Sequence, residues 1–261
     1  ISSGLVGSEM CIRDSNKGVE AILNVIPVQS RDFTWDVSAS FSLLRSEVIS
    51  IADGIDQIYV GGYVGRGNIA IPGLPYGILE GEVIRRDYGS LDGTDHTQVH
   101  WDDRTNYTPI VNANGGYQFL GYGVIGNPQP DFVYGVTNTL SYKWATLRVQ
   151  FDSQVGGDVF STTNSTLLGR GILQETDFDR FVPVVTNGLS ADGTPNTTQT
   201  TANAHYWPNT GVFYDENSIY DASVMRLREV SLSFVAPKSF LNGTPFGLSL
   251  IHISEPTRPE D

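Results

Sequence analysis

Apolar and polar positions alternate along residues 132–154, in two runs that a Lys143-Trp144 turn separates, and Asn138 is the only break in the first run. Because successive side chains of a β-strand point to opposite faces, each run predicts a strand with one apolar and one polar face. Together the runs predict an antiparallel hairpin. Each strand is about ten residues long, which is what a tilted strand needs to cross a bilayer. The apolar face carries Phe132, Tyr134, Val136, Leu140, Tyr142, Ala145, Leu147, Val149 and Phe151.

The same period of two recurs elsewhere, most clearly over residues 32–44. A second clear run covers 224–235 and a moderate one 18–26, and residues 78–86 are a further candidate strand. A soluble β-sandwich would bury the apolar faces of these strands, whereas a membrane barrel would turn them toward lipid. In the barrel, Phe33 and Trp35 would belong to an aromatic girdle at one rim.

The connections between these predicted strands alternate in length. Residues 27–31, 143–144 and 236–247 are short turns, whereas residues 45–131 and 155–223 are long and polar. An up-and-down barrel of the outer membrane has this pattern, with short periplasmic turns and long outer loops, and a Greek-key sandwich has no reason for it. We therefore expect an all-β fold, a partial antiparallel up-and-down transmembrane β-barrel. In this chain it would be a curved open sheet with long extracellular loops.

The two ends of the chain share a coding coincidence. The DNA sequence GAGATGTGTATAAGAGACAG can encode Glu9–Ser15, and its reverse complement, in one frame, can encode Leu248–Ser254. Both segments resemble the translated transposon end of a sequencing-library adapter, which is excluded from fold reasoning. We therefore expect residues 1–15, which hold the only cysteine, and 248–261 to be adapter-derived, and residues 16–247 to be a portion of a longer receptor barrel.

Composition narrows the function classes further. The chain has 261 residues and a formal net charge of −13, so it lacks the basic surface that nucleic-acid phosphates require. It contains no apolar run of the length of a transmembrane helix, about eighteen residues. This does not argue against a membrane barrel, because barrel strands alternate rather than run apolar throughout.

Three motifs, in this order along residues 16–247, are more specific than the alternation. The first is Asn16-Lys17-Gly18-Val19-Glu20 with Asp32-Phe33-Thr34-Trp35-Asp36-Val37. The second is Gly126-Asn127-Pro128-Gln129-Pro130-Asp131-Phe132, followed by Tyr134-Gly135, Asn138-Thr139 and Ser141-Tyr142-Lys143. The third is Tyr220-Asp221-Ala222-Ser223 with Arg226-Leu227-Arg228, Val230-Ser231-Leu232 and Pro237-Lys238. In this combination the chain resembles the SusC/RagA-type TonB-dependent outer-membrane transporters.

The resemblance implies a transporter of Bacteroidetes-type bacteria in the outer membrane, with a many-stranded barrel in contact with lipid and a plug domain elsewhere in the full-length protein. It implies import of oligosaccharides or peptides, driven by TonB and assisted by a SusD-like surface lipoprotein. This segment would supply barrel wall and outer loops, with no enzymatic activity and no cofactor. The chain departs from the family at Lys143-Trp144-Ala145, where a Gly or Asn is more usual, and this affects only the turn type.

Aromatic residues in the predicted outer loops are the candidate substrate contacts. Flat rings can stack on the faces of sugars through dispersion and C–H contacts, which would suit a glycan importer. Packing of one loop on another is the alternative role for each ring. The candidates are Trp101, Tyr107, Tyr206, Trp207 and Tyr214.

Other possible chemistry is weaker. His96 and His100 have the i, i+4 spacing of a helical zinc site, but they lie among turn residues, so we expect a solvated loop and no metal. Residues 65–70 match a loose dinucleotide fingerprint, which we reject because Pro72 prevents the strand–helix context. No G-x-S-x-G nucleophile motif occurs.

Two rival functions remain open from the sequence. Asp102-Asp103 and Asp177 with Asp179 could be the paired carboxylates of a β-rich glycosidase, although solvated loop acids explain them as well. A secreted β-sandwich that binds glycans, such as an adhesin, is the other rival. A closed sandwich that buries Phe33, Phe41 and Val149 together would favour the binding module.

Overall fold

The computed structural model describes residues 12–63, 65–87, 100–209 and 214–235, apart from the side chains of residues 63 and 207–209. The predictions on Cys11, His96 and Leu248–Ser254 lie outside the described residues. The chain divides into two compact units, each described by itself. The first comprises residues 1–19, 42–133 and 154–224, and the second comprises residues 20–41, 134–153 and 225–261.

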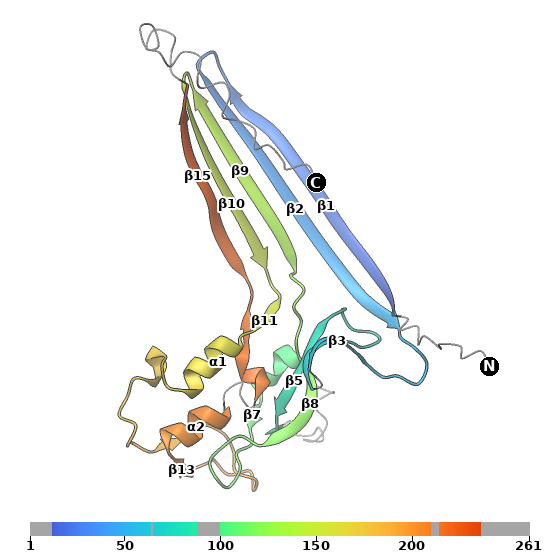
Figure 1. Ribbon diagram of the computed structural model, residues 1–261, viewed down its shortest axis with the longest axis vertical. Coiled ribbons are helices and arrows are strands. Elements are labelled where there is room, and N and C mark those ends of the chain that lie inside the picture. Colours follow the sequence, from blue (N-terminus) through green and yellow to red (C-terminus); the bar gives the residue numbers. More distant parts are fainter. Residues whose placement is uncertain (1–11, 64, 88–99, 210–213, 236–261) are drawn as a thin grey trace, which may run out of the picture. The chain divides into compact units, whose positions relative to one another are not determined.

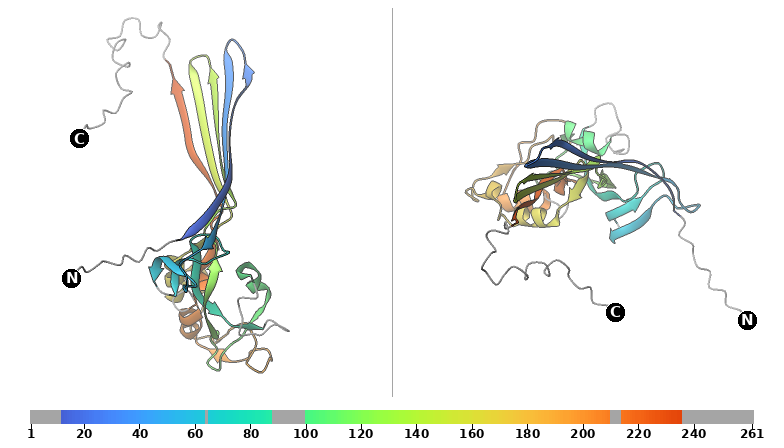
Figure 2. Two further views of the ribbon diagram at one scale, coloured as in Figure 1. Left: turned by 90° about the vertical axis from the view of Figure 1, so that its right-hand side faces the viewer. Right: turned by 90° about the horizontal axis from the view of Figure 1, so that it is seen from above.

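Five long strands form one sheet in the order in which they occur along the chain. Arrows of neighbouring strands run in opposite directions, and the strands form a single open layer (Figures 1 and 2). The predicted up-and-down antiparallel order and the open sheet are therefore confirmed. The strands are β1 (Arg13–Gln29), β2 (Phe33–Ser50), β9 (Phe132–Tyr142), β10 (Ala145–Val155) and β15 (Val224–Phe234).

The first two strands are longer than the sequence predicted. β1 extends beyond residues 18–26 at both ends, and β2 continues to Ser50. Backbone pairing continues there although the side chains no longer alternate, so periodicity gave no signal for the extensions. β1 begins at Arg13, inside the segment expected to be adapter-derived, and the origin of the two chain ends stays a prediction.

Contacts made by the Lys143-Trp144 turn connect it to neighbouring parts of the second unit. Lys143 has a φ of 53°, the left-handed conformation that a glycine adopts without strain, so this turn is tight although it lacks the usual Gly or Asn. Its backbone N–H donates to the carbonyl oxygen of Asp32 in the neighbouring turn at 2.9 Å. The ring of Trp144 lies 5.5 Å from that of Phe234, measured between centroids, and joins the turn to β15.

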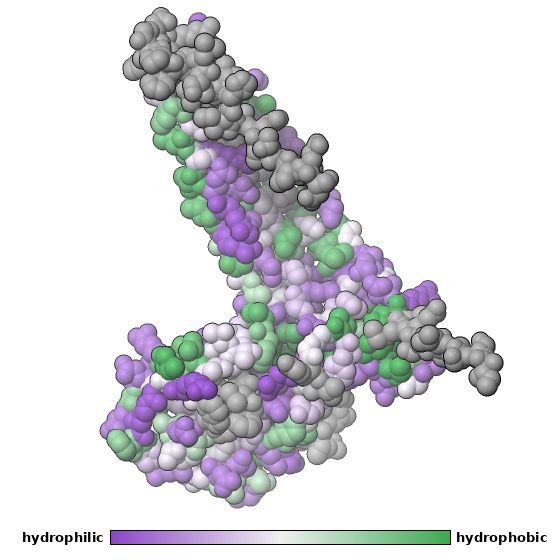
Figure 3. Space-filling view, viewed as in Figure 1, coloured by the Kyte–Doolittle hydropathy of each residue, from purple (hydrophilic) through white to green (hydrophobic). Residues whose placement is uncertain are grey.

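The apolar side chains of this unit are not covered by a second layer. Among its described residues no hydrophobic side chain is buried, and Phe41, a residue that a sandwich would bury, is 37% exposed. Trp35 donates its ring N–H to the side-chain oxygen of Asn138 at 3.2 Å, which explains the polar break in the apolar face. Hydrophobic residues lie at the surface along the long strands in Figure 3. The largest exposed fractions belong to Ile22, Leu23, Met225, Leu227, Val230, Leu232 and Phe234.

The first unit contains a second sheet, built within the connection between β2 and β9. Its strands also pair in chain order: β3 (Ile58–Tyr63), β4 (Arg66–Ala70), β5 (Ile78–Ile84) and β8 (Phe119–Gly126). The strand predicted over 78–86 is therefore present as β5, and the long connection is a folded sheet rather than a simple loop. Its hydrophobic core is formed by Leu79, Val83 and Ile125, with Leu120 and Ile219 packed against them.

Short elements complete the first unit. Neither short α-helix was predicted, because their residues lack an apolar period; α1 begins with the Ser161 hydroxyl accepting from the Asn164 N–H at 3.2 Å. No helix in the described part of the chain has the length and hydrophobicity to span a membrane. The elements are β6 (Arg86–Asp87), η2 (Trp101–Asn106), β7 (Thr108–Pro109), β11 (Asp158–Phe160), α1 (Thr162–Gly169), η3 (Gln174–Thr176), β12 (Val184–Val185), β13 (Gln199–Thr200), α2 (Ala202–Asn209), η4 (Asp215–Ser218) and β14 (Ile219–Asp221).

Candidate functional site

The predicted substrate-contacting rings lie in several places rather than one. Trp101 begins the 3-10 helix η2 and Tyr107 follows its end, both half-buried. Tyr206 lies in α2, whereas the side chain of Trp207 is outside the described part. Tyr214 precedes η4, and its hydroxyl donates to the carbonyl oxygen of Tyr117 at 2.5 Å. Their role as substrate contacts stays a prediction.

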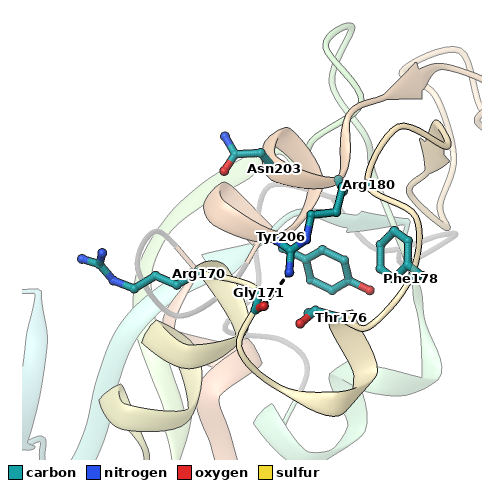
Figure 4. A pocket seen from close by; sticks show the side chains of 9 residues that line it. Arg170, Gly171, Thr176, Phe178, Arg180, Asn203 and Tyr206 are labelled. Carbon is teal, nitrogen blue, oxygen red and sulfur yellow. Dashed lines mark hydrogen bonds between the residues drawn. The ribbon is translucent and has the colours of Figure 1, made fainter.

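Tyr206 lines a cavity of about 290 Å³ between the end of α1 and the start of α2, which we call the helix cavity (Figure 4). The ring of Tyr206 lies 6.0 Å from that of Phe178. Arg180 points between these rings and the backbone, and donates to the carbonyl oxygen of Gly171 at 2.5 Å (Figure 4). Arg170 extends away from the two rings (Figure 4). The helix cavity therefore offers one held guanidinium group beside two aromatic rings.

A half-buried histidine supports α2 beside this cavity. Nδ1 of His205 lies 2.9 Å from the hydroxyl of Thr186, which in turn donates to the carbonyl oxygen of Gly115. Since that hydroxyl has only one proton to donate, His205 is the donor of the first hydrogen bond. Burial lowers the pKa of His205, so its neutral form is favoured.

Trp101 lines a larger cavity of about 550 Å³, which we call the indole cavity. Three rings contribute, those of His100, Trp101 and Tyr122, and the first two have centroids 3.7 Å apart. Ile69, Ile71 and Leu74 supply an apolar wall, while Gln57, Glu80 and Arg104 are the polar side chains that line it. Ligand sites of proteins commonly have this composition, mostly apolar and aromatic with a few placed polar groups.

The polar groups of the indole cavity are held by neighbouring elements. Glu80 on β5 is 6% exposed and accepts a hydrogen bond from the side-chain amide of Gln57 at 3.0 Å. Arg104 on η2 is 5% exposed and donates to the carbonyl oxygen of Val124 at 2.7 Å. Burial, opposed by the Gly65 amide and assisted by Glu80, raises the pKa of Tyr59.

Buried charges join the two long connections, and no pattern along the chain indicates their pairing. Asp215 is fully buried, pairs with Arg66 at 2.7 Å, and accepts the backbone N–H of Glu82 at 3.0 Å. A Cβ atom added at Gly81 would lie only 2.6 Å from the Cβ of Asp215, so a glycine is required for this close approach. Burial, and next the charge of Asp215, raise the pKa of Glu82, while Arg66 lowers it.

A second part of this ion network is centred on Glu216. Its carboxylate pairs with Arg86 and lies 4.0 Å from Arg104, and all three side chains are more than nine-tenths buried. Burial raises the pKa of Glu216, and the two arginines oppose this shift. The one sequence signal was the presence of two glutamates on one face of β5, but their partners come from a segment far along the chain.

The metal, paired-carboxylate and dinucleotide motifs considered from the sequence do not form such sites among the described residues. In the described part of the chain, no group of three or more His, Cys, Asp or Glu side chains is placed to hold a metal ion. Asp102, Asp103, Asp177 and Asp179 are all exposed. Residues 66–70 form strand β4, not the turn before a helix that a dinucleotide would need.

Comparison with known proteins relates both the sequence and the fold to one family. No protein-family model matches the chain. It is 25% identical over 262 residues to TonB-dependent receptor P3 of Formosa agariphila, covering 92% of this chain and 23% of that protein. It is 26% identical over 240 residues to TonB-dependent receptor P26 of the same organism, covering 85% and 22%.

Solved structures agree on the fold. The RagAB peptide transporter matches with a TM-score of 0.54 at 18% identity, covering 87% of this chain and 23% of that one. The RagAB peptide importer in its closed-closed state matches with a TM-score of 0.53 at 17% identity, covering 89% and 24%. The chain is thus similar in sequence to TonB-dependent receptors and in fold to the SusC-like RagA transporter.

The resemblance inferred from the three motifs is thus confirmed, as is the partial all-β barrel fold. The SusC/RagA-like chain spans less than a quarter of the length of the curated relatives that it matches. Those relatives are named as TonB-dependent receptors, and that this chain is no enzyme stays a prediction.

Proposed function

We propose that this chain forms part of the wall and outer loops of an outer-membrane TonB-dependent transporter that imports oligosaccharides or peptides. One observation carries the proposal. Within the second unit, residues 20–41, 134–153 and 225–235 of the long strands and their turns present apolar side chains, and none of these is buried. In water such a surface would be unfavourable by about 25 cal/mol per Å² of apolar area, whereas lipid removes this penalty.

The segregation of the connections supports the same reading. Residues 30–32 and 143–144 are tight turns, whereas the connections 51–131 and 156–223 contain the second sheet, the short helices and all the cavities described above. In outer-membrane barrels the long connections face the outside, where substrate arrives. We propose this orientation for the folded connections of the first unit.

The partners belong to the proposal as well. Because the structural relatives are named as a peptide transporter and importer, a peptide is one candidate substrate class, and a glycan is the other. In the full-length protein we propose TonB as the energy-transducing partner and a SusD-like surface lipoprotein as the outer partner. The rival β-sandwich module requires a second layer over the apolar face, and no described residue supplies one.

The apolar and polar faces of β10 provide a matched test. In a Cys11→Ser background, Leu147→Cys and Gln150→Cys are labelled with a polarity-sensitive dye and studied in detergent micelles. The two positions lie on opposite faces of one strand. We expect the label at 147 to have blue-shifted emission that a brominated detergent quenches, and the label at 150 to be water-exposed.

Two results would contradict the proposal. One is equal quenching at the two positions. The other is a monodisperse, monomeric chain in buffer without detergent, because uncovered apolar faces and unpaired edge strands should cause aggregation there.

A further inference from the structure

The two tight turns of the second unit lie at the same end of the long strands (Figure 1). We call residues 30–32 and 143–144 the turn end. The backbone N–H of Lys143 donates to the carbonyl oxygen of Asp32 at 2.9 Å and joins the two turns. Arg31 is exposed in one turn and Lys143 in the other, and neither forms an ion pair with any described residue. The turn end therefore presents two cationic side chains without a protein counter-charge in contact.

Aromatic side chains surround these cations. Tyr142 and Trp144 flank Lys143 in the chain, and Phe234 ends β15 beside them. All three side chains are more than half exposed, and the ring of Trp144 lies 5.5 Å from that of Phe234. Tyrosine and tryptophan gather at the level of the lipid headgroups, because each has an apolar ring with a polar group. The turn end therefore has the composition of a membrane interface.

The lengths of the strands place the turn end at the same level. β9 and β10 each contain 11 residues. With about 3.4 Å per residue and a tilt of about 45°, such a strand rises about 26 Å. The apolar band of an outer-membrane barrel is about 25 Å high. A turn that directly follows the strand therefore leaves the apolar band and enters the layer of phosphate groups.

The conformation of Lys143 favours a function for its side chain. Its φ of 53° would suit a glycine, and a lysine is strained there. Its ammonium nitrogen lies 5.3 Å from the centroid of the Tyr142 ring, which is an attractive cation–π distance. This contact holds the charge beside the aromatic side chains. Backbone strain of this kind is typical of functional positions.

We propose that the turn end docks the headgroup of an anionic phospholipid of the periplasmic leaflet, with Arg31 and Lys143 contacting its phosphate group. Guanidinium and ammonium groups both donate hydrogen bonds to phosphate oxygens. The turn end carries two cations and one carboxylate, that of Asp32, so it favours phosphatidylglycerol over the zwitterionic phosphatidylcholine. This inference rests on the proposed function, because it requires that the strands cross the membrane.

Quenching of tryptophan fluorescence by brominated lipids measures lipid contact at the turn end. Of the four tryptophans, Trp35 and Trp144 belong to the second unit. The purified chain is kept in dodecyl maltoside micelles, and phosphatidylglycerol or phosphatidylcholine with dibrominated acyl chains is added at increasing mole fraction. Bromine quenches only the tryptophans that the lipid contacts. The ratio of the two half-quenching mole fractions therefore gives the preference of the turn end for the anionic headgroup.

We expect phosphatidylglycerol to reach half-quenching at a mole fraction about fivefold lower than phosphatidylcholine, which is the effect of one net positive charge near a headgroup. Arg31→Gln or Lys143→Gln makes the turn end neutral and should abolish the preference, whereas Lys143→Arg should keep it. Asp32→Asn removes the opposing charge and should raise the preference to about 25-fold.

Two further variants serve as controls. Lys143→Gly removes the charge together with the backbone strain, so a loss of preference in this variant is not caused by a distorted turn. Arg170→Gln removes an exposed cation of the first unit and should keep the preference of the unaltered chain.

Three results would overturn the inference: equal half-quenching by the two lipids, an unchanged preference in both Arg31→Gln and Lys143→Gly, or an equal loss in Arg170→Gln. The dye experiment on β10 separates this failure from failure of the proposed function. Quenching of the label at position 147 without a lipid preference would refute the headgroup site and leave the membrane assignment intact. A water-exposed label at position 147 would refute the membrane assignment, and the headgroup site with it.

Discussion

Removal of one arginine from the buried ion network should greatly destabilise the first unit. Arg86→Met leaves the carboxylate of Glu216 with a backbone hydrogen bond from Ile84 and with Arg104, whose nearest nitrogen is 4.0 Å away. The side chains of Arg86 and Glu216 are 7% and 8% exposed, so water cannot replace the lost partner. Breaking a buried pair in this way costs about 3–5 kcal/mol.

An exposed ion pair of the same unit supplies the matched control. Arg45 and Asp131 are 2.9 Å apart, but their side chains are 51% and 63% exposed. Solvent screens such a pair, and its contribution is about 0–1 kcal/mol. Arg45→Met should therefore have a much smaller effect than Arg86→Met, although both substitutions remove one arginine and one ion pair.

Hydrogen–deuterium exchange of the chain in detergent measures the difference locally. Since 1.4 kcal/mol corresponds to a factor of ten, amides of β5 and η4 should exchange about 100- to 4000-fold faster in Arg86→Met. The double variant Arg86→Met with Glu216→Met should recover part of the protection, because it removes the carboxylate that lost Arg86, although Arg104 then loses Glu216. Equal effects of Arg45→Met and Arg86→Met, or no recovery in the double variant, would refute the assignment of a buried network.

Three further predictions use the same exchange measurement. Burial lowers the pKa of His205, so its stabilising contribution is present above the ordinary pKa of about 6.5 and is lost as the pH falls through the lowered value; α2 should lose protection as the pH falls below about 6.5, and His205→Asn should not respond. Lys143→Gly should stabilise the β9–β10 hairpin by about 0.5–1 kcal/mol by removing left-handed strain, and an equal gain in Lys143→Ala would contradict this reason. Ser161→Ala should destabilise α1 by about 1 kcal/mol and Ser161→Thr by less, since only alanine removes the cap acceptor; equal losses would argue against capping.

Strand periodicity is the part of the fold that local sequence determined. The alternation around Lys143-Trp144 predicted β9 and β10 closely, because each side chain of a strand reports which face it occupies. The lengths of the connections then predicted the up-and-down order. Strand alternation and connection length are both properties of residues close together in the sequence, so both can be predicted without knowledge of tertiary contacts.

The folded content of the long connections was decided by tertiary structure. Residues 45–131 contain many glycines and prolines and read as loop, yet β3, β4, β5 and β8 pair there as a sheet. Each of these strands is short. Its apolar residues are buried by neighbouring strands, and the strand alone is too short to show an alternating pattern. The sequence detected only β5, where apolar pairs flank the central Glu80-Gly81-Glu82.

Within the candidate site, the sequence by itself determined which residue types were present, rings and acids in polar connections. Only the tertiary structure placed Trp101 beside Glu80 in one cavity, and Asp215 beside Arg66. Burial distinguishes these groups from the solvated loop acids such as Asp177, and burial depends on segments distant in the chain. A charged side chain contributes little to stability while water surrounds it and much more once it is buried and paired. Burial cannot be predicted from the local sequence, because distant segments of the chain exclude the water.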